Sequence, residues 1–135
     1  AAGAFGYDFR AAVEMIRAID QLNASRITRG EPPLITGIGV NTGVVIAGGL
    51  GTSDRLHYTI IGDAVNTAQR LETLTRQVYS TSGVIVSNTT FVALAESAGE
   101  FRFEPAGHHL VKGKSEQLQV YRLETRDKKP LEVML

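Results

Sequence analysis

The stretch TIIGDAVNTAQRLE, Thr59 to Glu72, contains the change of secondary structure on which the fold depends. A β-branched run ends at Gly62 and Asp63, and a helical pattern begins immediately after it. Asp63 can cap that helix, because its carboxylate can accept hydrogen bonds from backbone amides of the first turn. Asn66 and Arg70 are four residues apart and therefore share one helix face. The stretch predicts a strand, a tight turn and a helix over 63–79 that presents an amide beside a guanidinium.

The two faces of this helix have different chemistry. We expect Val65, Ala68 and Leu71 to pack against a sheet. Asn66 and Arg70 then lie on the other face, where an amide can hold a ribose oxygen and a guanidinium can stabilise charge on a transferring phosphoryl group. On the pattern alone, the alternative is that Arg70 is a solvated surface residue and Asn66 has no special role.

The elements around this helix predict an α+β fold. An apolar helical repeat predicts a helix over 9–26, and a second, short helix over 88–99 is capped by Asn88 or Ser87. Alternation and β-branched runs predict strands over 34–41, 44–49, 56–61, 84–87, 101–110 and 117–123. Because the first three strands are joined by short connections, we expect two consecutive antiparallel hairpins there. The order favours a sandwich in which helices cover a mostly antiparallel sheet.

Length and charge exclude several classes of protein. A chain of 135 residues is long enough for one domain with a real core. Acidic and basic residues number 14 each, so there is no reason to expect a nucleic acid polymer as partner. The lack of cysteine excludes disulfides and thiolate metal sites. There is no apolar run of membrane-spanning length, and without a starting methionine we expect a piece of a longer protein.

Two further motifs carry weaker signals. The segment VKGKSE, residues 111–116, places Lys112 and Lys114 between two strands, where either could reach a phosphate or simply form a basic turn. The glycine-rich segment 39–55 is neither a Walker loop nor a dinucleotide fingerprint, because strands follow it. The three histidines show no metal-ligand spacing.

Taken together, these pieces resemble the second half of the catalytic domain of class III adenylyl and guanylyl cyclases. The resemblance rests on GIGVNTGVVIAGGLGTSDRLHYTIIGDAVNTAQRLE, residues 37–72, and on GHHLVKGKSEQLQVYRLE, residues 107–124. It implies a ferredoxin-like nucleotidyl cyclase sandwich that is incomplete at its N-terminus. Residues 1–124 would form the C-terminal two thirds of that catalytic domain, and we expect 125–135 to be a flexible tail.

The resemblance implies a role for each polar residue. Asn66 would orient the ribose, and Arg70 would stabilise the pentavalent α-phosphate. Thr59 stands at the purine-selecting position and favours adenine, as in a bacterial-type subgroup of adenylate cyclases. Lys112 would contact the terminal phosphates, with Lys114 as second choice. The implied reaction converts ATP to 3′,5′-cyclic AMP and pyrophosphate, for signal transduction.

The resemblance also implies a cofactor and a partner. Two Mg²⁺ or Mn²⁺ ions would be held by two aspartates on earlier strands, and nothing in this chain matches that motif. We therefore expect the metal ligands in a missing N-terminal part. A head-to-tail homodimer would join the metal half of one subunit to the Asn66 and Arg70 half of the other, so this polypeptide alone is expected to be inactive. We expect a cytoplasmic location, where ATP is, although the parent protein could be tethered to a membrane.

Three alternatives remain open on the sequence. The domain could be a guanylate cyclase, because Thr59 does not exclude guanine. It could be a catalytically inactive cyclase-like module that binds nucleotide or regulates another domain, although a decayed domain has no physical need to keep Asn66 and Arg70. A plain structural α+β domain fits the ordered motifs least.

Overall fold

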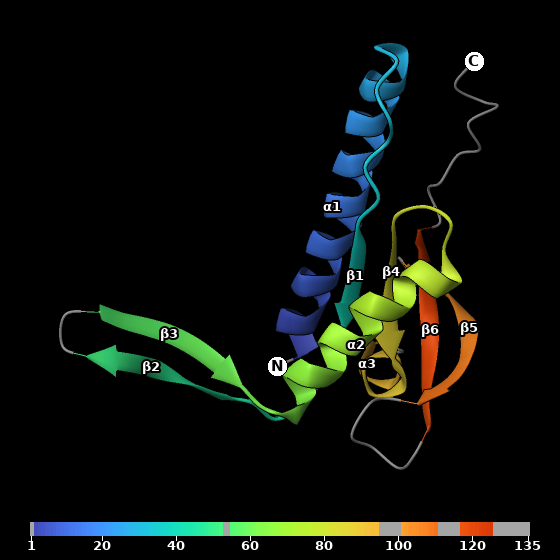
Figure 1. Ribbon diagram of the computed structural model, residues 1–135. Coiled ribbons are helices and arrows are strands. Elements are labelled where there is room, and N and C mark those ends of the chain that lie inside the picture. Colours follow the sequence, from blue (N-terminus) through green and yellow to red (C-terminus); the bar gives the residue numbers. More distant parts are fainter. Residues whose placement is uncertain (1, 53–54, 95–100, 111–116, 126–135) are drawn as a thin grey trace.

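The computed structural model describes residues 2–52, 55–94, 101–110 and 117–125. These residues form three helices and six strands, arranged around a four-stranded sheet from which a long hairpin projects (Figure 1). In chain order the elements are α1 (Ala2–Thr28), β1 (Gly37–Val40), β2 (Ile46–Thr52), β3 (Arg55–Ile61), α2 (Asp63–Val78), β4 (Gly83–Ser87), α3 (Asn88–Leu94), β5 (Phe101–Leu110) and β6 (Gln117–Thr125). The predicted 125–135 tail lies outside the described residues except for Thr125, which ends β6.

The main sheet has the strand order β1-β4-β6-β5. β4 pairs with β6 and β6 pairs with β5 in antiparallel fashion, whereas β1 lies parallel to β4. Two of the three pairings are therefore antiparallel, and helices cover the sheet. The predicted α+β sandwich is confirmed.

One of the two expected hairpins is wrong. β2 and β3 do form an antiparallel hairpin, from Ile46 opposite Ile61 to Thr52 opposite Arg55. β1, however, does not pair with β2; it runs parallel to β4, and α2 makes the crossover between them. Pairing with β4 lets Ile38 and Val40 pack against the buried core, which the projecting hairpin could not offer.

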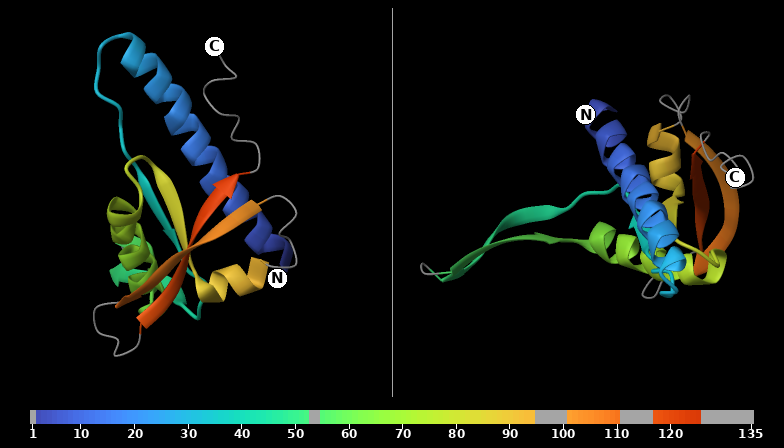
Figure 2. Two further views of the ribbon diagram at one scale, coloured as in Figure 1. Left: turned by 90° about the vertical axis from the view of Figure 1, so that its right-hand side faces the viewer. Right: turned by 90° about the horizontal axis from the view of Figure 1, so that it is seen from above.

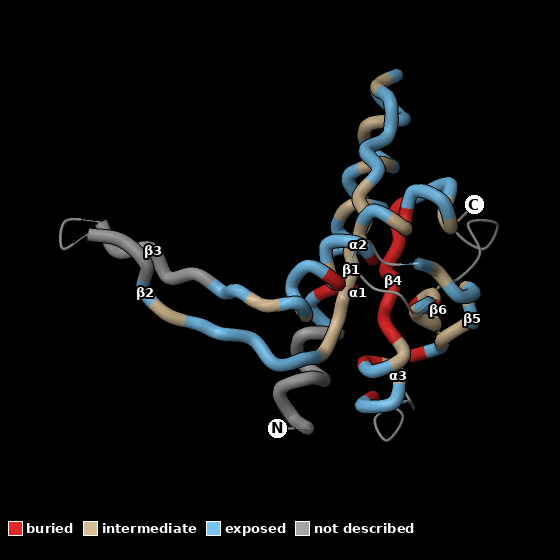
Figure 3. Tube along the Cα trace, turned by 60° about the horizontal axis from the view of Figure 1, so that its bottom comes forward, coloured by how far each residue is buried: buried red, intermediate tan, exposed pale blue. Residues whose placement is uncertain are grey.

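The sheet is buried on both faces. In β4, Val84 and Val86 face the core formed with α1 and α3, while Ile85 faces α2. The left view of Figure 2 shows α2 on one side of the sheet and α1 and α3 on the other. Every residue of β4 is buried, as Figure 3 shows. β4 is thus the strand around which both layers pack.

The helix α2 approaches β1 unusually closely because β1 contains glycines. A Cβ atom on Gly39 would lie 2.3 Å from the backbone oxygen of Ala68 and 2.3 Å from the backbone nitrogen of Glu72. The residues that this contact buries on α2 are Thr67, Leu71 and Thr75. The expected sheet-facing stripe was therefore partly wrong: Leu71 is buried, but Val65 is exposed, because the backbone contact rotates the helix toward its threonines.

The helix ends show which residues cap them. The backbone N–H of Thr90 donates to Ser87 Oγ over 3.3 Å, which identifies Ser87 as the cap of α3. The helix predicted over 9–26 is confirmed as α1, which is longer at both ends. The predicted stop of α3 at Gly99 lies outside the described residues.

Tyr79 closes the C-terminal end of α2. Its hydroxyl donates to the backbone oxygen of Val84 over 2.9 Å, and the guanidinium carbon of Arg122 lies 4.7 Å from its ring centroid. Burial raises the pKa of Tyr79 above its ordinary value of 10.0, although the charge of Arg122 acts in the opposite direction. Arg122 in turn forms an ion pair with Glu124 at 3.4 Å.

Two glycine substitutions test the close packing of α2. Gly39→Ala should lower the free energy of unfolding by about 1–3 kcal/mol, because its methyl group must push the backbone of α2 away from β1. Gly48→Ala is the matched control, since a Cβ at that strand glycine has no heavy atom within 4 Å. Urea denaturation followed by circular dichroism measures both. Equal stability of the two variants would contradict the packing described.

The buried hydroxyl of Tyr79 should make stability depend on alkaline pH. A phenol whose pKa is raised by folding contributes stability below its unfolded pKa and loses it as pH rises through the folded value. The free energy of unfolding should therefore fall as pH rises above 10.0, and less steeply in Tyr79→Phe than in the wild type. Denaturant titrations at a series of pH values compare the slopes; identical slopes would show that Tyr79 ionises equally in both states.

Candidate active site

The candidate site is built where β3 passes into α2. Gly62, at the junction, has φ 158° and precedes the first helical residue, Asp63. Its carbonyl accepts hydrogen bonds from the backbone N–H groups of Val65 at 3.1 Å and Asn66 at 3.3 Å. A Cβ at Gly62 would lie 3.2 Å from the oxygen of Val44, so glycine here lets the chain before β2 approach α2.

Asp63 does not have the position expected of it. The expected cap is wrong, because the N-cap residue is Gly62 and no side-chain hydrogen bond caps the helix there. Asp63 instead occupies the first turn, where a carboxylate is favoured by the partial positive charge of the helix N-terminus.

Asn66 and Arg70 lie one turn apart on an exposed face of α2. No hydrogen bond or ion pair joins either side chain to another described residue. Each is followed directly by a buried residue, Thr67 at 3% and Leu71 at 0% exposure. Because those neighbours hold the helix against the sheet, the polar face is anchored while its own donors stay available for a ligand.

The other residues predicted for the site are placed less completely. Thr59 lies on β3, which leads into α2, and its cross-strand partner is Gly48. Lys112 and Lys114 lie outside the described residues. The structure thus brings Asn66 and Arg70 onto one face and puts Thr59 on the preceding strand.

The described residues do not fit a two-metal site. They contain no group of three His, Cys, Asp or Glu side chains positioned to hold a metal ion. Asp63, at the start of α2, is already engaged in an interaction. No metal-dependent step can be derived from these residues.

Among the described helices, none is both long and apolar enough to cross a membrane.

One contact at the site escaped the sequence-based reasoning. Asn41 Nδ2, at the end of β1, donates to the backbone oxygen of Ala64 in the first turn of α2 over 3.0 Å. The available signal was a polar Asn-Thr pair at the point where an apolar strand meets Gly43. Such a pair also fits an ordinary turn, so nothing in the local pattern distinguishes Asn41.

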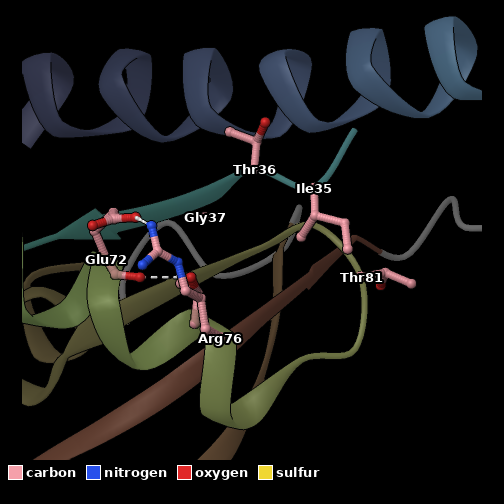
Figure 4. A pocket seen from close by; sticks show the side chains of 7 residues that line it. Ile35, Thr36, Gly37, Glu72, Arg76 and Thr81 are labelled. Carbon is pink, nitrogen blue, oxygen red and sulfur yellow. Dashed lines mark hydrogen bonds and ion pairs between the residues drawn. The ribbon is translucent and has the colours of Figure 1, made fainter. Parts of the chain in front are cut away.

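A cavity lies elsewhere on α2. It has a volume of about 210 Å³ and lies between the start of β1 and the C-terminal half of the helix (Figure 4). Arg76 and Glu72, which line it, form an ion pair at 3.6 Å. None of the residues predicted for the site lines this cavity. Asn66 and Arg70 are exposed on a different part of α2 and do not line this cavity.

Comparison with known proteins identifies the family. The sequence model of the family described as "Adenylate and Guanylate cyclase catalytic domain" matches residues 8–125. The terminal-differentiation-specific adenylate cyclase of Dictyostelium discoideum is 35% identical over 131 residues, which are 93% of this chain and 6% of that protein.

Solved structures agree with this assignment. The adenylyl cyclase CyaB from P. aeruginosa superposes with a TM-score of 0.71 at 26% identity, covering 87% of this chain and 58% of that chain. The guanylyl cyclase Cya2 has a TM-score of 0.66 at 28% identity, covering 86% of this chain and 56% of that chain. The ferredoxin-like cyclase fold is thereby confirmed, and this chain spans little more than half of each structure. The chain belongs to the class III nucleotidyl cyclase family and carries a large part of its adenylate and guanylate cyclase catalytic domain.

Proposed function

We propose that this chain supplies the Asn66 and Arg70 half of an adenylate cyclase active site that converts ATP to 3′,5′-cyclic AMP and pyrophosphate. One observation carries the proposal: an amide and a guanidinium lie one turn apart on an exposed helix face, without partners among the described residues, on a helix anchored by Leu71. This arrangement suits a nucleotide, because the guanidinium can pair with a phosphate and the amide can hold a ribose oxygen.

The proposed chemistry assigns one task to each side chain. The ribose 3′-oxygen forms a bond to the α-phosphorus and loses its proton, while the bond from that phosphorus to the bridging oxygen of the β-phosphate breaks. Asn66 holds the ribose so that the 3′-oxygen lies in line with that leaving bond. Arg70 donates to the α-phosphate oxygens, where negative charge develops in the transition state. Thr59 would select adenine, and Lys112, or else Lys114, would hold the terminal phosphates.

The site is proposed to be completed by a second copy of the protein. An open helix face cannot enclose a nucleotide, so the remaining walls must come from elsewhere. Apolar residues exposed at the base of the β2–β3 hairpin support a head-to-tail homodimer: Val44, Ile46, Ile60 and Ile61 are 92%, 74%, 52% and 52% exposed. A soluble domain rarely leaves such a cluster open to water.

The metal requirement belongs to the same proposal. Two Mg²⁺ or Mn²⁺ ions would be held by carboxylates of the full-length protein outside residues 1–135. The 135-residue chain alone would then be inactive. A cytoplasmic location follows from the substrate, since ATP is plentiful there.

A guanylate cyclase is the second candidate. Its support is the superposition on a guanylyl cyclase with a TM-score of 0.66, which differs little from the 0.71 found with an adenylyl cyclase. Assays with ATP and GTP in parallel separate the two. A non-catalytic nucleotide-binding module predicts binding without turnover of either.

Two arginines of α2 provide a matched test of the catalytic role. In the full-length protein, Arg70→Ala should reduce cyclic AMP formation by roughly 10²–10³-fold, because a charge-stabilising donor is lost from the transition state. Arg76→Ala removes the same kind of side chain from the same helix, but its partner is Glu72, and it should keep the wild-type rate. Both substitutions remove exposed side chains and should change the free energy of unfolding by no more than about 0.5 kcal/mol.

Two results of this assay would contradict the proposal in different ways. A rate that falls equally in both variants would remove Arg70 from the mechanism. A folded full-length protein that binds ATP but forms no cyclic nucleotide with Mg²⁺ or Mn²⁺ would favour the non-catalytic module.

Mixing two impaired proteins tests the head-to-tail arrangement. Full-length Arg70→Ala keeps the proposed metal half, and the 135-residue chain keeps Asn66 and Arg70. Full-length Arg70→Ala alone should show only its residual rate and the 135-residue chain alone should show none, whereas the mixture should form cyclic AMP faster, because one composite site of the mixed dimer is complete. The 135-residue chain carrying Arg70→Ala is the control and should restore nothing. Activity of the 135-residue chain by itself would refute the proposed location of the metal ligands.

A further inference from the structure

We propose that Asn41 is a positioning residue, which fixes the first turn of α2 and thereby the Asn66 and Arg70 face. The catalytic consequence of this inference rests on the proposed function. The structural part does not, because it follows from hydrogen bonds that tie α2 to the core. Asn41 lies at the end of β1, outside the Asn66 and Arg70 face itself.

Asn41 links three elements through its amide. Its Nδ2 donates to the backbone oxygen of Ala64 over 3.0 Å, and its Oδ1 accepts from Ser87 Oγ over 2.7 Å. Because a carbonyl oxygen can only accept, the amide nitrogen must face Ala64, which fixes the orientation of the amide. The end of β1 is thus joined to the first turn of α2 and to the end of β4.

The hydrogen bonds extend beyond Asn41 into a network of hydroxyl groups. Ser87 Oγ is the donor toward both Asn41 Oδ1, at 2.7 Å, and Thr90 Oγ1, at 3.1 Å, so its single proton is shared between these two acceptors. The hydroxyls of Thr90 and Thr42 lie 3.0 Å apart and form the next hydrogen bond of the network.

The end of this hydrogen-bonded network at Ser87 and Thr90 is buried. Ser87 is 1% exposed and Thr90 is fully buried. Both also belong to the cap of α3, through the backbone N–H of Thr90 that donates to Ser87 Oγ. Since β1 and β4 are parallel, their carboxyl ends lie side by side at one end of the sheet. The hydrogen-bonded network joins these two carboxyl ends. Asn41 therefore transmits the position of the buried core to α2.

The first turn of α2, at the other end of this network, is the part that Asn41 holds in place. α2 begins at Gly62 without a side-chain cap, although its first turn carries Asn66. The chain before β2 approaches closely at this point: a Cβ on Gly43 would lie 2.6 Å from the Cβ of Ala64. Within this turn, the hydrogen bond from Asn41 Nδ2 to the backbone oxygen of Ala64 ties the helix to the end of β1. Losing it should let the first turn fray and displace Asn66.

Two asparagines of the chain provide a matched experiment. Asn41→Ala removes two hydrogen bonds made by one amide. Asn23→Ala also removes two, because Asn23 Nδ2 donates to the oxygen of Leu34 over 2.8 Å and its Oδ1 accepts from the N–H of Leu34 over 2.7 Å. Hydrogen exchange of residues 62–70 is measured in the full-length protein for both. Asn41→Ala should speed that exchange about tenfold, a local opening that Asn23→Ala should not produce.

The kinetic constants of the full-length protein provide a second measurement of the role of Asn41. Asn41→Ala should lower kcat on the order of 10²-fold with a smaller change in KM, because a displaced catalytic group is lost mainly from the transition state. Asn41→Asp should behave like Asn41→Ala at neutral pH, since a carboxylate cannot donate to Ala64. At acidic pH its protonated form can donate to Ala64 and accept from Ser87, so the protection of residues 62–70, relative to the intrinsic exchange rate at that pH, should return.

The outcomes separate this inference from the proposed function. Local exchange that rises in Asn41→Ala and not in Asn23→Ala supports the positioning role, even if the wild-type protein forms no cyclic nucleotide. Equal exchange of 62–70 in both variants would overturn it. A fall in kcat without any change in that exchange would also overturn it, because Asn41 would then act on the substrate directly.

Discussion

The contact between the backbone of α2 and the glycine strand β1 determines the rest of this structure. Only the absence of a Cβ at Gly39 lets the helix come so near, since that atom would lie 2.3 Å from two backbone atoms of α2. The contact fixes the rotation of the helix about its own axis. It buries Thr67, Leu71 and Thr75 and consequently leaves Asn66 and Arg70 on the exposed side.

The sequence predicted the local features of this arrangement well. The span of α2 and the sharing of one face by Asn66 and Arg70 follow from helical periodicity, which depends only on neighbouring residues. The parallel pairing of β1 with β4 was missed, because short connections favour hairpins and the burial of Ile38 and Val40 is a long-range effect. The cap assigned to Asp63 failed for a related reason: Gly62 takes the N-cap position, and a neighbouring segment packs there.

The candidate site could be predicted only as far as its residues form a local pattern. Asn66 and Arg70 were identifiable because their spacing equals one helical turn. Asn41 was not, because its role depends on Ala64 and Ser87, which lie 23 and 46 residues away. Residues that act through others in this way are visible only once the contacts of the folded chain are known.

The division of labour along α2 explains how an exposed site can still be precise. A side chain that must bind a charged ligand cannot itself be held by protein partners, since its donors would then be occupied. Rigidity has to come from its neighbours. In α2 both residues of the candidate site are followed by a buried one, Asn66 by Thr67 and Arg70 by Leu71, so the position of each candidate group is set one residue away. The side-chain hydrogen bond from Asn41 does the same for the helix start, where packing alone leaves the turn without a cap.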